Sequence, residues 1–142
     1  MALSSFKIYT DAGLTTPLTS NLLATQASDG SSDPVDFQLW LGSTSAGKEL
    51  KTDTNPGTNQ ITLSITDTTA GVGHLPAEVK LALTQGALTA ATGGAPLNLG
   101  TSILSGVVNA VTFWIRVDDA TGSVGQSTEL GVTTPALREY SV

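Results

Sequence analysis

The sequence predicts an all-β protein, an antiparallel immunoglobulin-like β-sandwich. Apolar and polar residues alternate in residues 111–117 and again in residues 35–41. Because successive side chains of a strand point to opposite faces, each stretch is expected to bury one face and to expose the other. Further short apolar stretches follow at intervals, separated by Gly, Pro and Asn turns, and this spacing is typical of sandwiches and barrels. The chain has no cysteine, so it lacks the inter-sheet disulfide of antibody domains.

The other expected strands are short, and each is bounded by a turn signal. Asn55-Pro56-Gly57 is the clearest of these signals, because all three residue types favour turns. In chain order the expected strands are residues 6–9, 21–27, 35–41, 48–51, 60–66, 111–117, 128–133 and 136–140.

Residues 76–85 fit two structures. Pro76 at the start, Glu78 in the first turn and Gly86 after the end are the punctuation of a helix. Val79, Leu81 and Leu83 have the strict period of two that a strand requires. We favour the strand because the neighbouring segments are strands and ten residues would make only a short helix.

The length and the charge limit the organisation and the partners of the chain. A chain of 142 residues suits one domain, residues 1–142, with a core of its own. The formal net charge of −6 argues against nucleic acid and against an anionic membrane as partners. No apolar stretch is long enough to span a bilayer, and the first residues lack the pattern of a secretory signal. We therefore expect a soluble protein made in a cytoplasm.

No residue cluster in the sequence indicates an active site, a metal site or a cofactor site. His74 is the only histidine and is expected to be an ordinary loop residue, since no nucleophile motif accompanies it. Asp118 and Asp119 are expected to end a strand, because adjacent strand residues point to opposite faces. Residues 29–33 lack the ligand spacing of an EF-hand and are expected to form a turn. We expect no enzymatic activity, no cofactor and no small-molecule substrate.

Both tryptophans, Trp40 and Trp114, fall on the expected outer face of their strands. Two interpretations stay open. Each indole is covered by a local loop or by a long neighbour such as Arg116, or the two form a contact patch, since aromatic residues and arginine are enriched at interfaces. If the two strands are neighbours, both indoles share one face with Gln38 and Arg116.

Several motifs resemble small β-sandwich proteins encoded among bacteriophage virion genes. In the second half of the chain these are the Leu-Asn-Leu-Gly sequence of residues 97–100, Gly106, and residues 111–118. In the first half they are residues 6–11 and residues 36–42. The resemblance covers most of the chain and implies an accessory structural protein without catalytic residues.

The resemblance implies a capsid decoration (cement) protein, or alternatively a small tail or connector component. Its partners would be the major capsid protein or other virion proteins, with homo-oligomers expected, and its location would be the virion, assembled in the host cytoplasm. A second class of function also stays open, a carbohydrate-binding module in which Trp40 and Trp114 form a stacking platform beside Asp36 and Gln38.

The two ends of the chain are possible arms, residues 1–5 and 136–142. Each carries apolar anchors that suit addition to the edge of a neighbouring sheet. Together with the tryptophan face, these ends give the expected interface residues: Trp40, Trp114, Gln38, Arg116, Leu3, Leu137 and Tyr140.

Overall fold

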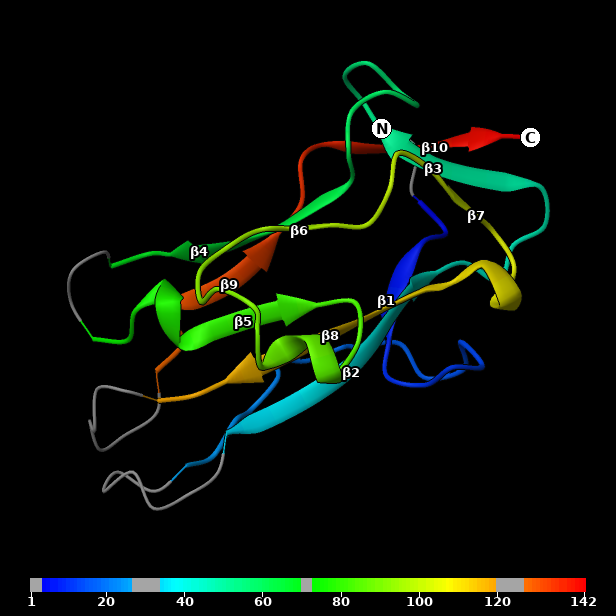
Figure 1. Cartoon of the computed structure of the whole chain (residues 1–142). Coiled ribbons are helices and arrows are strands. Elements are labelled where there is room, and N and C mark those ends of the chain that lie inside the picture. Colours follow the sequence, from blue (N-terminus) through cyan, green and yellow to red (C-terminus); the bar gives the residue numbers. More distant parts are fainter. Residues whose placement is uncertain (1–3, 27–33, 70–72, 120–126) are drawn as a thin grey trace.

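A computed structural model describes residues 4–26, 34–69, 73–119 and 127–142 and confirms the all-β prediction (Figure 1). The helical elements in these ranges are three single turns of 3-10 helix: η1 Pro76–Glu78, η2 Gly86–Leu88 and η3 Val107–Asn109. The strands are β1 Lys7–Tyr9, β2 Val35–Gly42, β3 Lys48–Thr52, β4 Thr62–Asp67, β5 Val79–Ala82, β6 Leu97–Asn98, β7 Ile103–Leu104, β8 Val111–Val117, β9 Leu130–Thr133 and β10 Leu137–Ser141. No helix in the described ranges is long and apolar enough to cross a membrane.

In the part of the chain that the structure describes, the strands form three antiparallel sheets. The largest has the order β1-β2-β8-β5, and the two smaller ones have the orders β10-β3-β7 and β6-β4-β9. Strands distant in the chain are neighbours in every sheet, since β2 pairs with β8 and β3 pairs with β10. The topology therefore depends on long-range pairing, because few of the strands form hairpins with the next strand along the chain.

The register of β2 against β8 puts their apolar residues on a common face. Leu39 lies opposite Phe113 and Phe37 lies opposite Ile115, while Trp114 lies opposite Gln38 on the other face. The alternation in the sequence predicts this division, and the structure confirms it.

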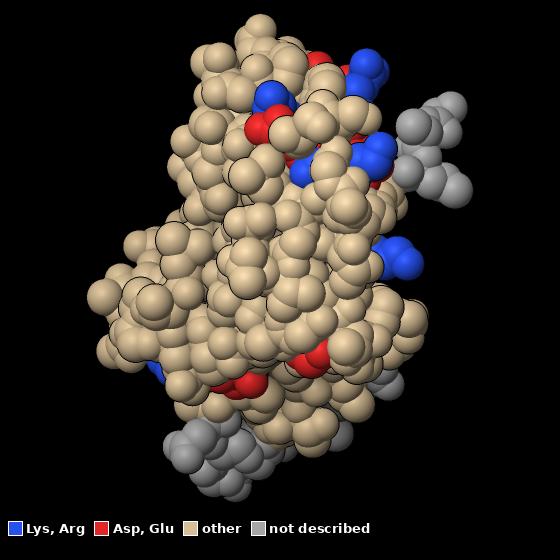
Figure 2. Space-filling model, turned by 90° about the vertical axis from the view of Figure 1, so that its right-hand side faces the viewer, with Lys and Arg blue, Asp and Glu red and all other residues tan. Residues whose placement is uncertain are grey.

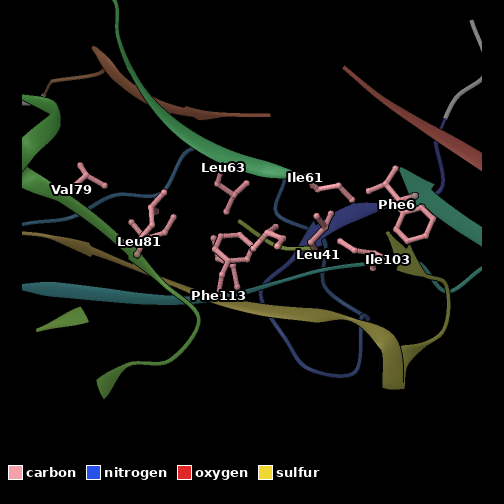
Figure 3. Packing of buried hydrophobic residues seen from close by; sticks show 12 residues of the cluster. Phe6, Leu41, Ile61, Leu63, Val79, Leu81, Ile103 and Phe113 are labelled. Carbon is pink, nitrogen blue, oxygen red and sulfur yellow. The ribbon is translucent and has the colours of Figure 1, made fainter. Parts of the chain in front are cut away.

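The apolar faces of the three sheets meet in one core. Figure 3 shows Leu81 and Phe113 of the large sheet facing Leu63 of β4 and Ile61, the residue before β4. Leu50 and Ile103 extend the core beneath the β10-β3-β7 sheet. The large sheet thus packs against the two smaller ones in a sandwich-like arrangement, and burying a large aliphatic side chain contributes about 1.5–3 kcal/mol.

Residues 76–85 contain both of the structures considered for them. Pro76 and Glu78 form one 3-10 turn, and the chain then extends into β5, in which Val79 and Leu81 are buried. The strand predicted here is confirmed over residues 79–82. It ends before Leu83, whose side chain is exposed.

The strand predicted at residues 21–27 is wrong over its described part, since residues 21–26 pair with no sheet. Leu22 packs against the core, but Leu23 is mostly exposed. The segment therefore contacts the core through Leu22, and its backbone is irregular.

The segment after β5 returns close to η1, and this approach requires glycine. A Cβ at Gly93 would lie 2.0 Å from the carbonyl oxygen of Ala77, whereas a Cβ at Gly86 would meet nothing within 4 Å. Gly94 then donates its backbone N–H to the carbonyl of Val79, at 2.9 Å.

We predict that Gly93→Ala lowers the free energy of unfolding by about 2–3 kcal/mol, because backbone must move to admit the methyl group. Gly86→Ala is the matched control and should change stability by less than about 1 kcal/mol, with either sign. Urea unfolding of both variants checks this, and equal losses would contradict the close approach.

Candidate functional site

The two tryptophans lie outside the core on the same sheet, as the sequence predicts. Trp40 is flanked by Tyr9 of β1 and Thr112 of β8, and Trp114 by Gln38 of β2 and Ala82 of β5. Both indoles are half-buried. Their role as an interface stays a prediction.

A local loop covers the outer face near Trp40. Residues 10–17 fold back onto β1, where Leu18 donates its N–H to Ile8 at 2.8 Å. Leu14, at the tip of this loop, is buried and has a positive φ of 55°. A Cβ at Gly42 would lie 2.9 Å from Leu14 Cδ1, so glycine at this position of β2 makes room for the leucine.

Asp11 holds this covering loop in place. Its carboxylate accepts hydrogen bonds from the backbone N–H groups of Thr15 and Thr16 and from the Thr15 hydroxyl, at 2.7–3.1 Å. The Thr15 hydroxyl is the main cause of a lowered pKa of Asp11. These hydrogen bonds therefore give the loop a defined structure on the outer face.

The second covering element is η2, which packs against β5 and β8. Leu88 of η2 and Ala82 of β5 are buried although neither belongs to the core between the sheets. They form a small apolar layer on the outer face beside Trp114. The covering loop and η2 thus add two buried apolar side chains, Leu14 and Leu88, to the outer face of the large sheet, and both interpretations of the tryptophans stay open.

Arg116 is held within the chain by Asp36. Its Nε and Nη2 donate to the two carboxylate oxygens at 2.8 and 3.0 Å, a bidentate pair across β2 and β8. Gln85 adds a third hydrogen bond to Asp36, at 3.1 Å. The Arg116 hydrogen bond lowers the pKa of Asp36, and the same bond raises the pKa of Arg116.

Residues near both ends of the described chain, Ser5 and residues 137–141, are bonded to the domain. Residues 137–141 form β10, where Leu137 lies opposite Thr52 and Tyr140 opposite Glu49 of β3. At the other end, the backbone N–H of Ser5 donates to Glu139 at 2.8 Å, and the Ser5 hydroxyl bonds to the same carboxylate. Leu3 lies outside the described residues.

The possible arm at 136–142 is therefore largely a strand of its own chain. The hydrogen bond from the Ser5 hydroxyl is the main cause of a lowered pKa of Glu139. Lys51 Nζ lies 5.5 Å from the centre of the Tyr140 ring, within reach of a cation–π contact. A contact between β10 and another chain would have to use its outer edge or its exposed face.

Two features of the structure have no counterpart in the expected interface residues. The first is an exposed apolar apex formed by Leu104, Val107 and Val108, with exposed fractions of 45%, 46% and 94%. It lies on β7 and η3, on the right-hand side of Figure 1, and Figure 2 shows that much of the surface on this side is uncharged.

Hydrogen bonds fix the shape of this apex. The N–H of Gly106 donates to Ser43 at 2.8 Å, that of Asn109 donates to Gly106 at 3.0 Å, and the Asn109 side chain donates to Ser105 at 2.8 Å. Gly106 has a φ of 107°, which favours glycine here. The apolar side chains are thus presented by a defined turn.

The second feature is a histidine–carboxylate cluster formed by His74, Glu78 and Asp119. His74 Nδ1 lies 3.3 Å from Glu78 Oε1 and 3.4 Å from Asp119 Oδ1. The three side chains are 20%, 4% and 16% exposed, respectively. The expectation that His74 is an ordinary loop residue therefore missed its neighbours, whereas Asp118 and Asp119 do follow the end of β8 as predicted.

The histidine–carboxylate cluster forms part of the wall of a cavity of about 1300 Å³ between the sheets. Phe37, Ile65 and Leu130 line the same cavity and give it a mainly apolar surface. The turn predicted at residues 29–33 lies outside the described residues.

Comparison with protein-family models, with curated proteins and with solved structures finds no match to this chain.

We predict that Asp36→Asn lowers the free energy of unfolding by about 1 kcal/mol at neutral pH, because it breaks a charge-assisted bidentate pair that is shielded from water. Asp53→Asn is the matched control. It removes an ion pair of the same length, Arg138 Nη2 to Asp53 Oδ1 at 2.8 Å, which is far more exposed, so the change should be close to zero.

The contribution of Asp36 should also depend on pH. Its pKa is lowered in the folded protein, so its stabilisation is complete above the pKa of the unfolded state, near 3.9, and is lost as the pH falls through the folded value. The difference between wild type and Asp36→Asn should therefore shrink below about pH 4. A difference independent of pH would contradict the ion pair as its cause.

Proposed function

We propose that the protein is a non-enzymatic structural protein of a bacteriophage virion, most specifically a capsid decoration protein that binds the major capsid protein. The observation that carries this proposal is the exposed apolar apex of Leu104, Val107 and Val108. The resemblance of the sequence to small virion β-sandwich proteins supports the virion role, and a contact with another protein would bury the exposed apex.

The apex is costly to leave in water. Full burial of a valine or leucine side chain contributes about 1.5–3 kcal/mol, and roughly half of this is available for Leu104 and Val107, which are already half-covered. A contact centred on these three side chains would therefore contribute a few kcal/mol for each copy. A contribution of a few kcal/mol for each copy is enough for a protein that binds a shell as an oligomer, because the contacts of joined copies add to the overall affinity.

Three of the six basic residues are already in ion pairs, which favours apolar attachment as well. Arg116, Lys51 and Arg138 each lie in an ion pair within the chain, with Asp36, Glu49 and Asp53. Exposed ion pairs contribute at most about 1 kcal/mol and are screened by salt. Attachment to the capsid should therefore resist high salt.

We include in this proposal the immunoglobulin-like topology and self-association of the protein. The antiparallel pairing in all three sheets and the long-range partners of β2 and β3 support an immunoglobulin-like arrangement. The outer edge of β10 supports self-association, because an unpaired strand edge can accept a strand from a second copy.

We predict that Val108→Asp lowers the occupancy of the protein on shells of the major capsid protein at least about tenfold, because a buried carboxylate cancels the apolar contact. Leu83→Asp is the control, since Leu83 is also an exposed aliphatic residue but directly follows β5 and is not part of the apex. Occupancy is measured by co-sedimentation and gel densitometry, with and without ~1 M salt.

Wild-type occupancy by Val108→Asp, or release of the wild type by salt alone, would contradict attachment through the apex. Absence of binding by the wild type to capsid shells, tails and connectors would contradict the virion role altogether. Sedimentation equilibrium of the free protein tests self-association separately.

A further inference from the structure

We propose that the histidine–carboxylate cluster of His74, Glu78 and Asp119 binds a divalent transition-metal ion, with Zn²⁺ as the best fit. Each residue offers one ligand atom, and the three atoms all lie within 4.8 Å of one another. This inference is independent of the virion role.

The two distances from His74 Nδ1 match those between the ligands of a tetrahedral ion, and the contact with Glu78 is also a long hydrogen bond. Zinc bonds to nitrogen and oxygen of about 2.0–2.2 Å give a separation of about 3.4 Å between two ligand atoms at the tetrahedral angle. The separations from His74 Nδ1 are 3.3 Å to Glu78 Oε1 and 3.4 Å to Asp119 Oδ1. A charge-assisted N–H···O bond is shorter, about 2.7–2.9 Å, and one ring N–H has a single proton to donate.

The donor set selects the class of cation. Magnesium requires octahedral oxygen ligands, with neighbouring ligand atoms about 3.0 Å apart, and calcium takes six to eight oxygens, so an imidazole ligand disfavours both. Imidazole with carboxylates suits zinc and neighbouring first-row ions, and the chain has no cysteine to favour a softer metal.

The backbone holds the ligands in position before any ion binds. The N–H of Leu75 donates to the second oxygen of Glu78, and the N–H of His74 donates to Glu129. The N–H of Asp119 donates to the side chain of Gln26 at 2.8 Å. The first of these bonds orients a ligand side chain, as the hydrogen bonds around metal ligands commonly do, and the other two fix the backbone that carries His74 and Asp119.

The location gives the ion a structural effect. His74 and Glu78 belong to the crossover from β4 to β5, and Asp119 follows the end of β8. A bound ion would therefore join the crossover between the two layers to the end of a central strand. His74, Glu78 and Asp119 all line the cavity, and a tetrahedral ion with three protein ligands would keep a fourth position for water or a further ligand.

The test is a zinc titration of tag-free protein, followed by thermal unfolding and by calorimetry. We expect one Zn²⁺ per chain and a rise in the unfolding midpoint of about 10 °C at a free zinc concentration 100-fold above the dissociation constant. Mg²⁺ and Ca²⁺ at the same concentration should leave the midpoint unchanged. Co²⁺ should give the strong visible absorption of a four-coordinate ion.

His74→Ala and Asp119→Asn should each weaken zinc binding more than about tenfold. Asp118→Asn is the matched control and should bind zinc as the wild type does, because Asp118 is the exposed neighbour of Asp119 outside the cluster. Because Asp119→Asn preserves the size of the side chain, it keeps the test valid if His74→Ala does not fold. No response of the wild type to zinc, or an equal response in Asp119→Asn, would overturn the proposal.

Discussion

The antiparallel pairing of β2 with β8 is the interaction on which the rest of the structure depends. One face of this pair supplies Leu39, Phe113 and Ile115 to the core, and the other presents both tryptophans. β1 and β5 add to its two edges and complete the large sheet. The same pairing brings Asp36 opposite Arg116, so the strongest ion pair of the outer face follows from the register that forms the core. A shift by one residue would exchange the two faces.

Sequence reasoning succeeds where alternation is strict and long. Residues 35–41 and 111–117 each continue the pattern over seven positions, so their faces and the positions of Trp40 and Trp114 are predicted correctly. It fails at residues 21–26, because two adjacent leucines do not define one face of a strand. The helix signals at Pro76 and Glu78 correspond to a single 3-10 turn. The alternation of Val79 and Leu81 then correctly predicts a strand over the next four residues.

The candidate sites are harder to predict, because each depends on contacts between distant segments. His74 and Glu78 have the spacing of neighbours on one turn, but nothing in the sequence joins them to Asp119, which reaches them only when β8 pairs with β5. The apolar apex is missed for the opposite reason. Val107 and Val108 have the composition of buried residues, and only the turn that begins at Gly106 directs them outward.

The hydrogen bonds between Ser5 and Glu139 join residues 134 positions apart. Most of the sheet pairings are also between distant segments, so the protein has a high contact order. Large loops must close before such contacts can form, which slows folding and leaves strand edges exposed in the meantime. We therefore expect refolding on a timescale of milliseconds to seconds, with the chain most prone to aggregate before β10 has paired with β3.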